Sequence, residues 1–118
     1  MKNKPTLKDF EFFKKCCLEF ADKWELNNWT FRFHFKRDKN EKFEGGKIIR
    51  YLDTYQAEIY LDPNYLTNRE DIKQTAKHEM VHCILGTLYI LGRSRYITES
   101  EIDREEEALT HKLEKLLK

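Results

Sequence analysis

The segment His78-Glu79-Met80-Val81-His82 constrains the fold of this chain more than any other part of the sequence. Two imidazoles four residues apart lie on one face of a helix, about one turn apart, and can then reach the same metal ion. The residue after the first histidine is a glutamate, which metal-assisted hydrolysis uses as a general base. The spacing therefore predicts a helix that presents His78, Glu79 and His82 together.

The residues around this motif favour such a helix. Asn68 can cap its N-terminus, and Asp71 completes a pair similar to a capping box. No proline occurs from Arg69 to Leu91, and Gly92 is a natural stop. We therefore expect a helix over 69–91. The motif alone leaves open the alternative that both histidines are solvated surface side chains, or that one of them is a hydrogen-bonded histidine of the core.

Hydrophobic periodicity predicts the other elements. An apolar stripe at helical spacing indicates a first helix from Thr6 or Leu7 to about Trp24. Alternating and apolar runs indicate three strands, and Thr98 can cap a last helix that reaches the C-terminus. The strands are expected at Trp29–Lys36, Lys47–Leu52 and Tyr55–Leu61. This order predicts one α+β domain over residues 1–118, with an antiparallel or mixed sheet packed against helices.

Composition excludes several classes of function. The chain has 118 residues with a net charge of +1, so no general electrostatic case for nucleic-acid binding exists. Three cysteines, two of them adjacent, make a poor disulfide framework, and a reducing cytoplasm is the simplest setting. The N-terminus lacks the apolar segment of a signal peptide, and no apolar run is long enough to span a bilayer.

A catalytic zinc site usually takes three protein ligands, so a third ligand is expected beyond the two histidines. At about 100° per residue, the glutamates of the last helix can be ranked by their angle around the helix axis from the apolar stripe that begins at Ile102. Glu106 lies about 40° from that stripe, Glu105 about 60° on its other side and Glu107 about 140° away. Glu106 is the first candidate because a carboxylate in an apolar face needs a partner. Glu105 and Glu107 stay open.

With the motif on one helix and an acidic helix after it, the chain resembles the gluzincin metallopeptidases, and most of all the compact zincin-like proteins of phages and bacteria. The resemblance covers nearly the whole chain. Outside the motif it depends on Trp24, Leu26 and Trp29, on Ala57-Glu58-Ile59-Tyr60-Leu61, and on Glu105-Glu106-Glu107-Ala108-Leu109. The chain lacks the downstream histidine of metzincins and the Glu-x-x-x-Asp signature of larger gluzincins.

The resemblance implies a minimal zincin-like fold, in which a helix, a three-stranded sheet, the motif helix and a C-terminal helix follow one another. It implies one Zn²⁺ held by His78, His82 and Glu106, with Glu79 as the general base for hydrolysis of a protein or peptide substrate. It also implies that Tyr55–Leu61 is an edge strand that binds the substrate backbone.

Two other functions are compatible with the sequence. One is a metal-stabilised interaction module that cleaves nothing, against which the intact Glu79 speaks. The other is a nucleic-acid-associated protease of the SprT-like kind, which the balanced charge and the absence of a zinc ribbon disfavour. We expect no nucleic-acid partner and no membrane partner.

Overall fold

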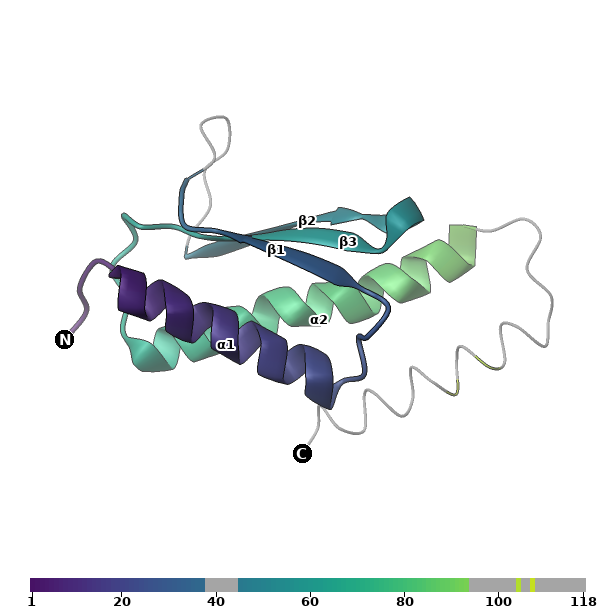
Figure 1. Ribbon diagram of the computed structural model, residues 1–118, viewed down its shortest axis with the longest axis horizontal. Helices are drawn as coiled ribbons and strands as arrows, with labels where there is room; N and C mark the ends of the chain where they lie inside the picture. Colours follow the sequence, from purple (N-terminus) through teal and green to yellow (C-terminus); the bar gives the residue numbers. More distant parts are fainter. Residues whose placement is uncertain (38–44, 94–103, 105–106, 108–118) are drawn as a thin grey trace.

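The computed structural model describes residues 1–37, 45–93, 104 and 107. Within them, helices and strands are mixed along the chain, as the sequence predicts for an α+β fold (Figure 1). The predicted last helix lies outside the described residues except for Arg104 and Glu107, which are both helical and exposed. The elements are α1 (Leu7–Lys23), β1 (Thr30–His34), β2 (Gly46–Tyr51), the short 3-10 helix η1 (Leu52–Thr54), β3 (Gln56–Leu61) and α2 (Arg69–Arg93).

The three strands form a mixed sheet in the order β1-β3-β2. β3 runs parallel to β1, with Ile59 opposite Phe33, and antiparallel to β2, with Ile59 opposite Ile48. The expectation that Tyr55–Leu61 is an edge strand is therefore wrong, because β3 is hydrogen-bonded on both sides. Ala57 and Ile59 of β3 are fully buried, as is typical of a central strand. The alternation of apolar and polar residues in one strand does not indicate the order of the strands in the sheet.

Helix α1 begins at a capping box. The Asp9 amide donates to the Thr6 hydroxyl (3.3 Å), and the Thr6 amide donates to the Asp9 carboxylate (2.9 Å), which satisfies two N–H groups at the helix start. The predicted apolar stripe is confirmed, since Phe13, Cys17 and Trp24 are buried. The helix therefore forms from a local signal and is fixed by burial of this stripe.

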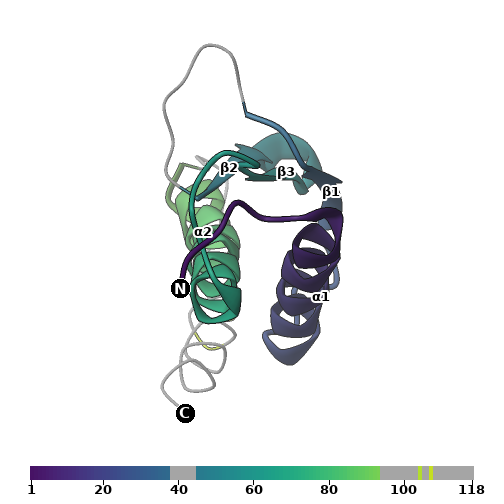
Figure 2. The same ribbon diagram turned by 90° about the vertical axis from the view of Figure 1, so that its left-hand side faces the viewer.

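Both helices cover the same face of the sheet, as Figures 1 and 2 show. At their N-terminal ends the two helices are joined by an ion pair between Arg69 and Asp9 (3.0 Å), and the Arg69 guanidinium lies over the Phe12 ring. The core lies between the helices and this face of the sheet. Within the described residues, no helix combines the length and the apolar character that crossing a bilayer requires.

Helix α2 begins as expected, because the Asp71 amide donates to the Asn68 side-chain oxygen (2.8 Å). The Asp71 carboxylate pairs with Lys2 (2.9 Å) and not with the cap backbone, so the capping box is only half formed. The helix ends at Arg93, so Gly92 lies in its last turn and does not follow it. The observed end lies two residues beyond the predicted end at Leu91, a difference that is normal at a helix terminus.

Candidate metal centre

The two motif histidines lie together on α2, as the spacing predicts. The ring centroids of His78 and His82 are 5.0 Å apart, and the planes are inclined by 80°. In tetrahedral geometry, two imidazole nitrogens at about 2.1 Å from a zinc ion are roughly 3.4 Å apart. Rings with this centroid separation can meet that spacing. His78 is exposed and His82 half-buried, so their nitrogens are accessible to an ion from solvent.

Glu79 lies between the histidines in sequence but is far more buried than His78. Only 6% of its surface is exposed. Burial raises the pKa of the Glu79 carboxyl, and the charge of His78 acts in the opposite direction. Within residues 1–37 and 45–86, no hydrogen bond or ion pair satisfies this carboxylate. A buried acid without a protein partner is costly for stability and is typical of a functional group.

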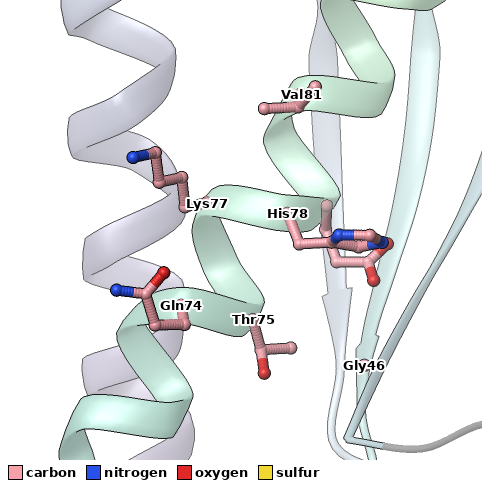
Figure 3. Close-up of a pocket in the computed structure, with 7 residues that line it drawn as sticks. Gly46, Gln74, Thr75, Lys77, His78 and Val81 are labelled. Carbon is pink, nitrogen blue, oxygen red and sulfur yellow. The ribbon is translucent and has the colours of Figure 1, made fainter. Parts of the chain in front are cut away.

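An open cavity of about 580 Å³ lies beside Glu79, between α2 and the start of β2. In Figure 3, His78 and Thr75 extend from α2 on the side where Gly46 lies. The residues that line the cavity are Gly46, Gln74, Thr75, Lys77, His78, Glu79 and Val81. The candidate base and one candidate ligand therefore share a space that is large enough for part of a substrate.

Gly46 allows β2 to approach α2 closely at this point. A Cβ atom on residue 46 would lie 2.5 Å from the Thr75 methyl carbon and 3.6 Å from the Glu79 side chain. The absence of a side chain therefore keeps the strand against the helix and leaves the space beside Glu79 open. The contact between Gly46 and Thr75 depends on tertiary packing, so the sequence alone does not indicate it.

Further along β2, the side chain of Arg50 contacts the backbone of the second histidine, His82. Its guanidinium Nη1 donates to the His82 carbonyl oxygen (2.9 Å), in a partly buried position. The pKa of His82 is lowered by burial first and then by the positive charges of His78 and Arg50. A lowered pKa keeps the imidazole neutral, which is the form that binds metal. Arg50 was not recognised from the sequence, since its partner is far away along the chain.

Glu106, the predicted third ligand, lies outside the described residues, and so does Glu105. Glu107, the third candidate, is exposed. Among the described residues, no group of three metal-ligating side chains is brought together. The pair His78 and His82 is therefore the part of the predicted ligand set that the fold assembles, and Glu106 remains a prediction.

The cysteines belong to the core and not to this centre. Cys16, Cys17 and Cys83 are buried and form no disulfide bond with one another, which agrees with the poor disulfide framework in the sequence. Burial raises the pKa of the Cys83 thiol to about 12 and also raises that of Cys17. Neutral buried thiols are poor ligands.

Comparisons with models of protein families, with curated proteins and with solved structures find no match for the chain.

Proposed function

We propose that this protein is a zinc-dependent metallopeptidase, in which His78 and His82 bind the metal and Glu79 is the general base. One observation carries the proposal. The two imidazoles lie on one side of α2 with ring centroids 5.0 Å apart, and a buried carboxylate lies between them in sequence, facing an open cavity. Donor type and spacing both fit a zinc ion.

The bound zinc ion would supply Lewis-acid polarisation of the scissile carbonyl and activation of a water molecule. The protein supplies the two imidazole ligands from α2. By resemblance to gluzincins, Glu106 of the last helix that the sequence predicts is the third ligand in this proposal. A ligand from a separate helix would also join the C-terminal segment to the motif helix.

Glu79 would accept a proton from the attacking water and pass it to the leaving amine. Its raised pKa suits this role, because a carboxylate of ordinary pKa is a weak base at neutral pH. The low exposure of Glu79 also limits competition from bulk water. The same carboxylate must change protonation state during turnover, so full stabilisation of its charge by a fixed ion pair would oppose catalysis.

The substrate backbone would pair with β2 and not with the central β3. The Asp62 amide donates to the Gly45 carbonyl (2.8 Å), so Gly45 directs its backbone groups toward β3. Orientation alternates along an antiparallel ladder, so Gly46, Ile48 and Arg50 direct their N–H and C=O groups to the outer edge. Among the described strands, none pairs with that edge. An extended peptide added there would pass beside His78 and Glu79.

The proposal is tested by peptide-bond cleavage in a denatured protein mixture, with zinc-loaded wild type beside Glu79→Gln. We expect the variant to lose at least about 100-fold in cleavage rate, because it keeps the shape and removes the base. Glu70→Gln is the matched control, since Glu70 is an exposed glutamate on the same helix. Wild-type activity in Glu79→Gln would contradict the assignment of the base. Zinc binding without any cleavage would favour the non-catalytic interaction module.

A further inference from the structure

The side chain of Arg50 lies on the face of the sheet that the helices cover. Arg50 lies opposite Ala57 in the sheet, and Ala57 is fully buried beneath the helices. Paired residues of two strands direct their side chains to the same face. The Arg50 side chain therefore extends on the helix-covered side of the sheet, next to the metal centre, although Arg50 belongs to the outermost described strand.

The guanidinium is held in a defined place. Its Nη1 donates to the His82 carbonyl oxygen at 2.9 Å. A Cβ atom on Gly86 would lie 3.1 Å from the same nitrogen, so the glycine leaves the space that the guanidinium occupies against the helix. This hydrogen bond uses one of five N–H donors in the guanidinium fork. A cation that is fixed by one donor and partly buried is suited to binding a carboxylate with another.

A peptide that pairs with the outer edge of β2 places one of its residues directly opposite Arg50. The side chain of that residue points to the same face as Arg50, and the next residue along the peptide points away. In an antiparallel addition, the peptide residue opposite Gly46 follows four positions later, because Gly46 precedes Arg50 by four. That later residue faces the cavity beside Glu79.

We propose that Arg50 is a specificity-determining residue that selects peptides with an aspartate or glutamate on the N-terminal side of the cleaved bond. This acidic residue lies four positions before the peptide residue that enters the cavity at Gly46. This inference rests on the proposed function for its reaction and on the β2 edge for its geometry. The pairing of carboxylate and guanidinium is a charge-assisted contact in a partly buried place, where such contacts are strongest.

The test uses four extended peptides with a phenylalanine as the cavity residue. Two carry glutamate or glutamine four positions before it, and two carry the same pair one position nearer. For zinc-loaded wild type, we expect kcat/KM to favour glutamate over glutamine by about tenfold at the first position. At the neighbouring position we expect a ratio near one, since that side chain points to the opposite face.

Variants of Arg50 show whether this residue causes the preference. Arg50→Gln should bring the glutamate-to-glutamine ratio to about one, and Arg50→Lys should keep a preference for glutamate. Arg50→Glu should favour the glutamine peptide, because like charges repel. Arg32→Gln is the matched control, because Arg32 is exposed on β1 and contacts Gln56. We expect its ratio to equal that of wild type. An unchanged ratio in Arg50→Gln would overturn the inference.

Binding of the same peptides separates this inference from the proposed function. Dissociation constants are measured by fluorescence anisotropy with Glu79→Gln, so hydrolysis does not interfere. If no peptide is cleaved by wild type but glutamate peptides bind about tenfold tighter through Arg50, the peptidase proposal fails and the Arg50 site stands. If peptides are cleaved and neither rate nor affinity distinguishes glutamate from glutamine, the Arg50 inference is wrong and the peptidase proposal stands.

Discussion

Glu79 is the residue at which the proposed function and the stability of the fold oppose each other. The residue is only 6% exposed, and burial raises the pKa of its carboxyl group. A group with a raised pKa in the folded state stabilises the fold only while it is protonated. That stability is fully present below the pKa of the unfolded chain, about 4.3, and is lost as pH rises through the folded pKa. At neutral pH the ionised Glu79 therefore destabilises the metal-free protein.

Glu79→Gln should accordingly raise the free energy of unfolding of the metal-free protein at pH 7.5 by about 1 kcal/mol, a usual gain for a substitution that relieves a functional residue. The measurement is urea denaturation with a chelator present. The gain should shrink as pH falls and vanish near pH 4, where Glu79 is protonated in both states. Glu70→Gln should show no such gain, and a gain that persists at pH 4 would contradict this explanation.

The cysteines give a second expectation at the scale of single residues. Cys16, Cys17 and Cys83 are buried, and the pKa of each thiol is raised by burial. We expect none of them to react with an aromatic disulfide reagent at pH 8 in the folded protein, and all three to react in 6 M guanidinium chloride. Rapid labelling of a native thiol would show that it is accessible and would make it a competing metal ligand.

How far the sequence predicts single residues depends on the distance over which they interact. His78, Glu79 and His82 were assigned correctly to one helix because the i, i+4 relation is local. Arg50 and Gly46 were missed as members of the site, since their contacts with His82 and Thr75 cross from β2 to α2. The arrangement of residues around a helix axis does not indicate which residues of a strand contact that helix.

Among the elements, the packing of β2 against α2 decides the geometry of the site. Both helices, all three strands and their approximate bounds were predicted from periodicity and caps. The order β1-β3-β2 was not, and it moves the expected substrate strand from β3 to β2. Strand order depends on long-range pairing, whereas periodicity reports only which side of a strand is buried.

The close approach of β2 to α2 can be tested at Gly46. Alanine in place of glycine in a strand usually stabilises by about 0.5–1 kcal/mol. At residue 46 the added Cβ would lie 2.5 Å from the Thr75 methyl carbon, so overpacking outweighs that gain. We expect Gly46→Ala to lower the free energy of unfolding by about 2 kcal/mol.

The matched control for this substitution removes the Thr75 methyl group, with which the added Cβ would clash. Thr75→Ser deletes the methyl group and keeps the hydroxyl, so the double variant Gly46→Ala/Thr75→Ser should recover most of the loss. Chemical denaturation of the wild type, both single variants and the double variant gives the coupling energy between the two positions. Additive effects would show that the strand and helix are not in contact at this point.

On the scale of the whole molecule, the site lies at the rim of the fold and not in its centre. The core is built from α1, the covered face of the sheet and the buried side of α2. Met80 and Cys83, within and next to the motif, are fully buried in it. His78 is exposed and His82 only half-buried. The same part of α2 therefore anchors the helix in the core and carries the two proposed ligands. Removing either histidine should leave the metal-free fold intact.

The central claim is that His78 and His82 hold one metal ion, and the most direct test is zinc content after incubation with zinc and gel filtration. We expect about one zinc ion per chain for wild type and Glu79→Gln, and almost none for His78→Ala or His82→Ala. Thermal unfolding with chelator should show all four proteins equally folded or, for Glu79→Gln, more stable. Zinc-free wild type, or as much zinc in the two histidine variants as in wild type, would contradict the account.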